Sequence, residues 1–263
     1  MRPERFSLAG RRALITGASS GIGRAVALGL SEHGATVVLH HFGDAAGAAA
    51  TAQAIGGDTA VLEADFTDTP AISVFVDNIL SNHGPIDILI ANAAIERRLA
   101  WHDATLAHIN AHVSANFSTF LLLAQKLVPP MAERGWGRVV ATGSVMSTRP
   151  RAETLVYASL KAAQLTAVRA LAREVGAQGV TINVVSPGAI ETEATARRYE
   201  DPPFRRAVTA KIPAGRQGRP DDVVGAFIFL CSDAANYVTG AEIPVDGGWT
   251  IGDAPGVLPG DVA

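Results

Sequence analysis

The sequence of 263 residues has little of several things, and each shortage excludes a class of protein. Its single cysteine, Cys231, rules out an intrachain disulfide and the usual cysteine-based zinc site. Cys231 follows the apolar run 227–230, which favours a buried, inert thiol over a nucleophile. No apolar run approaches the roughly 18 residues needed to span a bilayer, and the first residues lack the apolar segment of a signal peptide. We therefore predict no metal site, no membrane partner and a cytoplasmic location.

An excess of positive charge is also missing. The chain has 22 Lys and Arg against 25 Asp and Glu, a formal net charge of -3. Nucleic acids and anionic membranes reward a basic surface, so neither is expected as a partner. Hydrophobic residues make up 48% of the chain, enough for a large core. We expect a folded protein whose partner is a small molecule.

What the sequence does contain is a regular alternation of short apolar segments and helical patterns. The apolar segments lie at 13–15, 36–39, 60–62, 86–90, 138–141 and 181–185. Runs of consecutive apolar residues are typical of strands that are buried on both faces of a parallel sheet. Helices between such strands imply right-handed crossovers. We predict one α/β domain over residues 1–263, built on a doubly wound parallel sheet.

Two regions interrupt the alternation. Residues 191–220 are rich in Arg, Pro and polar residues, and 252–263 form a tail rich in Gly and Pro. The first region follows the carboxyl end of a strand, where ligands of such sheets bind. We interpret 191–220 as a substrate lid, with a plain solvated loop as the alternative.

A glycine-rich turn, T-G-A-S-S-G-I-G at residues 16–23, lies between the first strand and the first helix. Glycines let the backbone approach a pyrophosphate closely, and the amino end of the following helix attracts anions. The spacing G-x-x-x-G-x-G differs from the Rossmann G-x-G-x-x-G, and the Gly-Lys-Ser/Thr ending of a P-loop is missing. The turn predicts a dinucleotide site, although a tight connection without a ligand has the same pattern.

The choice of dinucleotide depends on the end of the second strand, L-H-H-F-G-D at residues 39–44. An acidic residue there would bind the ribose of NAD and repel the 2′-phosphate of NADP. Asp44 is about 20 residues beyond Gly23, but we interpret it as the N-cap of the following Ala-rich helix. No arginine stands ready for a 2′-phosphate either. The balance favours NADP(H) over NAD(H).

Tyr157 and Lys161 are four residues apart in a helical segment, so they project from one helix face. A phenol titrates near pH 10, and lowering its pKa by about 3 units needs roughly 4 kcal/mol. Lys161 plus an oxidised nicotinamide in a dry site would supply this, although a surface helix pair has the same spacing. Ser144 adds a hydroxyl at the carboxyl end of a strand. Asn116 adds an amide at a mid-helix position, unless it serves only helix packing.

These residues together resemble the short-chain dehydrogenase/reductase family, over residues 8–249. The turn at 16–23 matches T-G-x-x-x-G-x-G, A-N-A-A at 91–94 resembles N-N-A-G, and S-P-G at 186–188 resembles the nicotinamide-side motif. Ser144, Tyr157 and Lys161 fall at the catalytic spacing of the family. The resemblance implies a three-layer, Rossmann-like sheet of about seven strands. It also implies a homotetramer built on the helices around the catalytic residues.

The resemblance further implies roles for individual residues. Tyr157 would be the general acid/base, Lys161 would lower its pKa and bind the nicotinamide ribose, Ser144 would hold the substrate oxygen, and Asn116 would support a water relay to Lys161. Ser20 stands where many NADP-preferring members have a basic residue. The predicted cofactor-binding residues follow the whole cleft: Gly17, Ser19, Ser20, Gly21, Ile22, Gly23, His41, Asp65, Phe66, Asn92, Ala93, Tyr157, Lys161, Pro187, Gly188, Ile190 and Thr192.

Basic residues gather around the expected mouth of the site: Arg97, Arg98, Arg149, Arg151, Arg197, Arg198, Arg205, Arg206 and Lys211. They form either a solvated face or a site for an anionic substrate, such as a sugar acid or a 3-oxoacyl thioester carrier. A polyol or another secondary alcohol is the neutral alternative. We predict an NAD(P)(H)-dependent oxidoreductase that interconverts a secondary alcohol and a ketone or aldehyde. A non-catalytic dinucleotide-binding sensor or scaffold is the competing hypothesis, against which the four catalytic residues speak.

Overall fold

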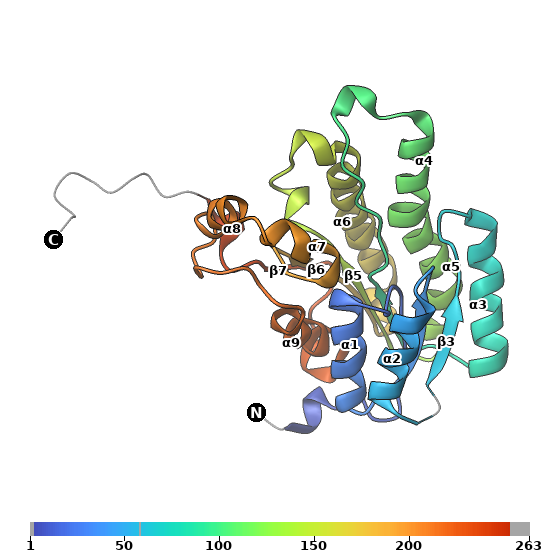
Figure 1. The fold of residues 1–263 in the computed structure, drawn as a ribbon. Helices are drawn as coiled ribbons and strands as arrows, with labels where there is room; N and C mark the ends of the chain where they lie inside the picture. Colours follow the sequence, from blue (N-terminus) through green and yellow to red (C-terminus); the bar gives the residue numbers. More distant parts are fainter. Residues whose placement is uncertain (1–2, 58, 253–263) are drawn as a thin grey trace.

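Seven parallel strands form the centre of the computed structural model, which describes residues 3–57 and 59–252 (Figure 1). Their order across the sheet is β3-β2-β1-β4-β5-β6-β7. The strands are β1 (Arg12–Ile15), β2 (Thr36–His41), β3 (Ala60–Glu63), β4 (Ile88–Ala91), β5 (Gly137–Thr142), β6 (Val180–Pro187) and β7 (Glu242–Val245). The chain winds outward in both directions from the β1–β4 pair, which confirms the predicted doubly wound sheet.

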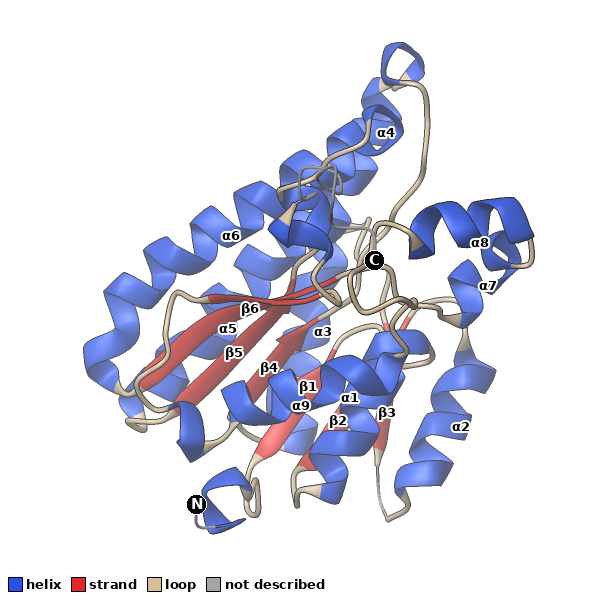
Figure 2. Ribbon diagram, turned by 90° about the vertical axis from the view of Figure 1, so that its left-hand side faces the viewer, coloured by secondary structure: helices blue, strands red, loops and turns tan. Residues whose placement is uncertain are grey.

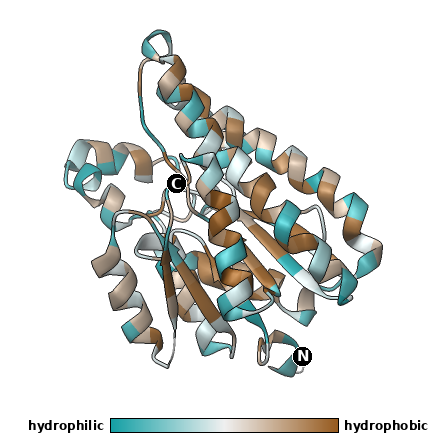
Figure 3. Ribbon diagram, turned by 90° about the vertical axis from the view of Figure 1, so that its right-hand side faces the viewer, coloured by the Kyte–Doolittle hydropathy of each residue, from teal (hydrophilic) through white to brown (hydrophobic). Residues whose placement is uncertain are grey.

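Helices cover both faces of the sheet (Figure 2). One face carries α1 (Gly21–Glu32), α2 (Ala45–Ile55) and α9 (Pro220–Cys231), and the other carries α3 (Thr69–His83), α4 (Leu106–Val113), α5 (Thr119–Glu133) and α6 (Leu155–Val175). Each face has its own hydrophobic cluster beneath these helices, and the strands between them are mostly hydrophobic (Figure 3). The predicted three-layer arrangement in one Rossmann-like domain is therefore confirmed. None of the helices in the described residues is both long and apolar enough to cross a membrane.

The strands differ in how clearly an apolar run in the sequence predicts them. All residues of β5 and β6 are buried, because these strands lie inside the sheet with a neighbour on each side. The edge strand β7 is only partly buried and contains Glu242 and Pro244, so it shows no apolar run. Proline is tolerated at an edge because fewer ladder hydrogen bonds are needed there. The resemblance predicted this seventh strand, and the apolar pattern did not.

The region 191–220 contains two short helices, α7 (Glu193–Tyr199) and α8 (Pro202–Thr209), where the sequence indicated irregular structure. Both lie beyond the carboxyl ends of the strands (Figure 1). Pro202 and Pro203 open α8, at the helix start where proline is tolerated. Most of the predicted tail, 253–263, lies outside the described residues. The fold thus brings the glycine-rich turn, the ends of β4, β5 and β6, and α7 to one edge of the sheet.

Candidate active site

A cavity of about 470 Å³ opens at the carboxyl ends of β1, β2 and β4. Many of the residues predicted to bind the cofactor line it: Gly17, Ser19, Ser20, Gly21, Ile22, Gly23, Asp65, Phe66, Asn92, Ala93 and Thr192. Residues that are far apart in the sequence are therefore brought together around one cleft. We refer to it below as the dinucleotide cavity.

The glycine-rich turn is held in one shape by close contacts and by hydrogen bonds to the sheet. A Cβ added to Gly23 would lie 1.9 Å from the carbonyl oxygen of Gly17 and 2.6 Å from Nδ2 of Asn92. Nδ2 of Asn92 donates to the carbonyl oxygen of Thr16 at 3.0 Å, and its Oδ1 accepts from Oγ1 of Thr142 at 3.1 Å. Asn92 therefore ties the turn to the ends of β4 and β5.

The amino end of α1 binds an anionic group within the structure itself. The N–H of Gly21 donates to Oε2 of Glu193, on α7, at 3.1 Å, and the N-cap Ser20 offers no side-chain hydrogen bond. Unpaired N–H groups and the helix dipole make such an end attractive to phosphates as well as carboxylates. The carboxylate of Glu193 shows that this cradle accepts an anion. The residues present thus fit a dinucleotide whose pyrophosphate would lie at Gly21.

The end of the cavity nearest β2 is lined by His40 and Phe42, not by the predicted His41. Alternate side chains of a strand point to opposite faces, so His41 is buried away from the cavity. Nδ1 of His40 accepts from the N–H of Gly17 at 3.1 Å, and Nε2 lies 3.0 Å from the carbonyl oxygen of Ala64. Burial lowers the pKa of His40 to about 4, so the ring is neutral. The alternation of the strand is the signal that would have identified His40.

A second cavity of about 220 Å³ adjoins the first, and Ile22 and Thr192 line both. We call it the substrate cavity. It contains five further residues that the sequence predicted for the site: Ser144, Tyr157, Pro187, Gly188 and Ile190. The two cavities are therefore neighbours, with the hydroxyls of Ser144 and Tyr157 in the smaller one.

Tyr157 and Ser144 both line the substrate cavity, and their side chains interact there. The Ser144 hydroxyl is held in place by the backbone, because its oxygen accepts from the N–H of Met146 at 3.1 Å. Burial raises the pKa of Tyr157 to about 12, the negative charge of Glu96 adds to this, and the hydrogen bond from Ser144 opposes it. The groups of the chain therefore favour the neutral phenol.

Lys161 is buried. We predicted that it lowers the pKa of Tyr157, but it is not among the groups that shift this pKa. Its Nζ donates to the carbonyl oxygen of Thr142 at 2.6 Å and to Oε1 of Gln164 at 3.4 Å. It lies 5.7 Å from the centre of the Tyr157 ring. Burial lowers the pKa of Lys161 to about 8. The contribution of an oxidised nicotinamide, the second source in the prediction, stays a prediction.

Asn116 lies in a π-helical turn, Ser114–Ser118, between α4 and α5. Its Oδ1 accepts from the N–H of Ile95 at 2.8 Å, and its Nδ2 donates to the carbonyl oxygen of Ile95 at 2.9 Å. The side-chain amide thus holds the loop that follows β4. The mid-helix amide has a use, as the sequence indicated, but it does not contact Lys161, so the water relay stays a prediction.

The predicted basic residues separate into groups. Arg98, Arg151 and Arg198 line the substrate cavity together with Glu96. Oε1 of Glu96 lies 2.8 Å from Nε of Arg98 and 3.9 Å from Nη1 of Arg198. Glu96 was missed in the sequence, where nothing sets it apart from a surface residue.

The other predicted cations lie elsewhere. Arg97 lines the dinucleotide cavity, and Arg205 forms a two-pronged ion pair with Glu191, at 2.9 and 3.0 Å. Four more line neither cavity: Arg149, Arg197, Arg206 and Lys211. The basic cluster of the sequence is thus mostly outside the site.

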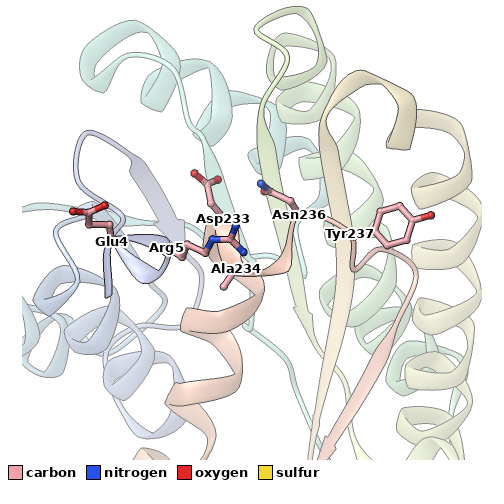
Figure 4. A pocket seen from close by; sticks show the side chains of 6 residues that line it. All are labelled: Glu4, Arg5, Asp233, Ala234, Asn236 and Tyr237. Atoms are coloured by element: carbon pink, nitrogen blue, oxygen red, sulfur yellow. The ribbon is translucent and has the colours of Figure 1, made fainter. Parts of the chain in front are cut away.

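A further cavity of about 630 Å³ lies at the other end of the strands, away from the two cavities described above (Figure 4). Arg138, at the start of β5, is buried beside it and contacts Asp233 and Asn236, which places the cavity at the amino ends of the strands. Figure 4 shows Tyr237 pointing away from the other lining side chains. None of the predicted site residues lines this cavity. The candidate active site therefore lies at the carboxyl ends of the strands, where the predicted site residues line the two cavities.

A family model described as enoyl-(acyl carrier protein) reductase matches residues 17–250. The chain belongs to the short-chain dehydrogenase/reductase family. It is 37% identical to gluconate 5-dehydrogenase of Gluconobacter oxydans (strain 621H) over 253 residues, 95% of this chain and 98% of the relative. It is 36% identical to 3-oxoacyl-[acyl-carrier-protein] reductase of Salmonella typhimurium (strain LT2) over 243 residues, 92% of this chain and 98% of the relative.

The solved structures agree. The crystal structure of gluconate 5-dehydrogenase from Burkholderia cenocepacia J2315, in complex with NADP and tartrate, superimposes with a TM-score of 0.88. It is 32% identical and covers 95% of this chain and 99% of its own. Membership of the family confirms the predicted class, an oxidoreductase that uses NAD(P) and acts on CH–OH or keto groups. The sensor or scaffold hypothesis is not favoured.

Proposed function

We propose that this protein oxidises a small hydroxy acid of the sugar-acid type, or reduces the corresponding oxo acid, with NAD(P)(H). One observation carries the proposal: the hydroxyls of Ser144 and Tyr157 share a cavity of about 220 Å³ with three arginines. A guanidinium binds a carboxylate in a fixed, two-pronged geometry, so the cavity can hold an acid group while a carbinol lies on the hydroxyl pair. The named activity of the gluconate relative and the tartrate in the Burkholderia structure support this substrate class.

Each catalytic residue then has a role that follows from its contacts. Tyr157 exchanges a proton with the substrate oxygen, and Ser144, fixed by Met146, orients that oxygen. Lys161 places a buried ammonium beneath the phenol, and Asn116 holds the loop that carries Glu96 and Arg98. The dinucleotide, when bound, supplies or accepts the hydride.

We assign cofactor binding to the predicted residues that line the cleft, with His40 and Phe42 in place of His41. The walls of the substrate cavity also include Phe204 and Val208 of α8, so we propose that 191–220 acts as a lid over the substrate. A homotetramer and a cytoplasmic location remain proposals from the family resemblance and from the need for the cellular dinucleotide pool. Light scattering of the purified protein and cell fractionation test these two.

A matched substrate panel tests the proposed function. D-gluconate and D-sorbitol differ at the end of the chain, where one has a carboxylate and the other an alcohol, and acetoacetyl-coenzyme A represents 3-oxoacyl thioesters. We expect gluconate to be oxidised with a kcat/KM at least about tenfold above that of sorbitol, since hydrogen bonds to charged groups contribute about 1.5–3 kcal/mol. Tyr157→Phe should lower kcat about 10²–10⁴-fold and change the dinucleotide Kd far less.

The other outcomes discriminate between the alternatives. Equal rates for gluconate and sorbitol would argue for a neutral alcohol. Reduction of acetoacetyl-coenzyme A alone would identify an acyl-thioester reductase, in keeping with the Salmonella relative. Binding of dinucleotide with no turnover across a broad panel of alcohols and ketones would revive the sensor hypothesis.

A further inference from the structure

The loop after β4 is held at two points by the helical segment that follows it. Asn116 binds the N–H and the carbonyl oxygen of Ile95. Two residues further along the loop, the N–H of Arg97 donates to Nε2 of His112, on α4, at 3.2 Å. The backbone of the loop is therefore anchored twice, once by an amide that does not titrate and once by an imidazole that does.

The partners of His112 determine its protonation state. A backbone N–H can only donate, so Nε2, which faces Arg97, is the unprotonated nitrogen. A carbonyl oxygen can only accept, so Nδ1, which lies 2.8 Å from the carbonyl oxygen of His108, carries the proton. The side chain of His112 is completely buried. The ring is thus a neutral imidazole with both nitrogens in use.

A second proton on this ring would break the anchor at Arg97. An imidazolium donates from both nitrogens, so two N–H groups would then point at each other. The new charge would also be buried, and a buried charge without a partner is unfavourable. Protonation of His112 and the hydrogen bond to Arg97 therefore exclude each other.

The surroundings of His112 favour the neutral ring. Among the described residues, three titratable or charged groups act on it: His108, whose ring centre lies 4.2 Å away, and Arg97 and Glu96 in the loop. In the same part of the chain, α6 and the π-helical turn pack against α4 but contribute none of these charges. Burial is the main reason that the pKa of His112 is lowered, and the charges of His108 and Arg97 add to it. The hydrogen bond to the His108 carbonyl and the charge of Glu96 oppose the shift.

The anchored residue lies between two side chains of the substrate cavity. Glu96 and Arg98, on either side of Arg97, both line this cavity, and Oε1 of Glu96 lies 2.8 Å from Nε of Arg98. The side chain of Arg97 itself lines the dinucleotide cavity. The place of the Arg97 backbone therefore determines where three charged side chains enter the two cavities.

We propose that His112 is a positioning residue for the acid-binding side of the site: its unprotonated Nε2 holds the loop at Arg97 so that Arg98 faces the substrate, and protonation of the ring in mildly acidic solution releases the loop. The proposal rests on the proposed function for its substrate, whereas the anchor is a property of the free protein. Because the pKa of His112 is lowered, the release occurs below about pH 6.5, the ordinary pKa of histidine. The carboxylate of a hydroxy acid stays ionised well below that pH.

A pH series with two variants of His112 tests the proposal. His112→Gln supplies an amide oxygen that can accept from Arg97 and does not titrate, and His112→Leu removes the acceptor. The KM of the wild type for D-gluconate should rise about three- to tenfold between pH 7.5 and pH 5, and that of His112→Gln should stay constant. His112→Leu should have the raised KM at both pH values. The pH dependence of kcat should be the same in the wild type and His112→Gln, because Tyr157 is intact in both.

His108→Gln is the matched control, since it removes the other imidazole of the pair and keeps the carbonyl group that Nδ1 of His112 faces. Its KM should respond to pH as in the wild type. A second measurement needs no substrate: hydrogen exchange of residues 95–98, followed by mass spectrometry and corrected for the intrinsic effect of pH. Exchange should be faster at pH 5 than at pH 7.5 in the wild type and in His108→Gln, and independent of pH in His112→Gln.

The two measurements separate this proposal from the proposed function. Exchange that does not respond to pH in the wild type, or responds equally in His112→Gln, would overturn the anchor whatever the substrate is, and these two proteins suffice if His112→Leu does not fold. A pH response in exchange without one in KM would show that the loop does not position Arg98. If exchange responds as expected but gluconate is not turned over, the sugar-acid activity fails and the anchor is supported, and the KM series then uses the substrate that the panel identifies.

Discussion

The two halves of the cleft are built from different materials. The dinucleotide half is made largely of backbone and uncharged side chains that bond to one another, with Asn92 and His40 each joining separate elements and with Asp65 and Arg97 as its charged residues. The substrate half is made of charged side chains on long arms, with Glu96 between Arg98 and Arg198. The first half is shaped by the fold itself. The second half holds charges that can exchange partners when a substrate arrives.

The energies of the two kinds of contact support this distinction. Leaving a buried polar group without its partner costs about 1–3 kcal/mol, so the network around Asn92 resists rearrangement. Ion pairs that are open to solvent contribute about 0–1 kcal/mol. The side chains of Glu96 and Arg198 are 32% and 40% exposed, so a substrate carboxylate can replace Glu96 at little cost. Ion pairs in the substrate half can therefore be replaced by contacts with a substrate, while the hydrogen bonds of the dinucleotide half stay as they are.

The largest expected effect comes from disturbing the rigid half. Gly23→Ala should weaken dinucleotide binding at least about 100-fold, because the new Cβ would lie 1.9 Å from the carbonyl oxygen of Gly17 and must displace the turn. Calorimetry with NAD⁺ and NADP⁺ measures the loss. Gly225→Ala, in α9, is the control: its Cβ meets nothing within 4 Å, and stability should stay constant or rise by up to about 1 kcal/mol. Normal binding by Gly23→Ala would show that the turn is as adaptable as the substrate half.

A smaller effect is expected in the substrate half. Arg98→Met and Arg198→Met should each raise KM for the hydroxy acid about 10–100-fold and change kcat less, because a carboxylate loses one charged partner. The KM for sorbitol should not move. Arg197→Met is the matched control, since Arg197 neighbours Arg198 and lines neither cavity. If all three variants behave alike, the arginines act as a diffuse field and the contrast between the halves is lost.

How far the sequence predicts each half follows from the same contrast. The glycine-rich turn and Asn92 could be placed from the sequence because only particular residues satisfy the backbone geometry there. The face of a strand was harder to predict: His41 was expected in the cavity, but the alternation directs His40 into it. In the substrate half, the contact of Glu96 with Arg198 joins residues far apart in the chain, and local patterns carry no sign of it.

The direction of the Tyr157 pKa shift could not be predicted from the sequence either. The spacing of Tyr157 and Lys161 correctly predicts a common helix, and both lie on α6. It does not reveal that the ammonium is directed at the carbonyl oxygen of Thr142, or that the charge of Glu96 raises the pKa of the phenol. Burial and partner choice decide these quantities, and both arise from tertiary packing.

Lys161 is buried next to Tyr157 on α6 and lines neither cavity, and its buried charge should appear in the pH dependence of stability. Its pKa is about 8 in the folded chain and 10.5 in the unfolded chain, so between these values the unfolded state binds more protons and stability rises with pH. Lys161→Met should remove a rise of about 1–3 kcal/mol between pH 8 and pH 10. Above pH 10 the raised pKa of Tyr157 acts in the opposite direction, because the folded state then holds the extra proton.

Urea unfolding at pH 7.5, 9 and 10 measures this difference between the wild type and Lys161→Met. Lys126→Met is the control, because the Lys126 side chain is 44% exposed and pairs with Asp77 at the surface. Its pH profile should match that of the wild type. A parallel profile in Lys161→Met would mean that water reaches the ammonium, and that this part of the site is as open as the substrate half.

The smallest expected effect concerns a contact between α7 and the glycine-rich turn. Glu193 of α7 accepts from Gly21 at the amino end of α1, where we place the pyrophosphate, so its carboxylate competes with the dinucleotide. Glu193→Gln should tighten dinucleotide binding about 2–5-fold, and the gain should shrink in 0.5 M salt, where exposed charges are screened. Glu200→Gln, at the other end of α7, changes the net charge equally and should have no effect. If Glu193→Gln instead weakens binding, then this carboxylate secures the lid in the bound form, and the substrate half helps to hold the dinucleotide.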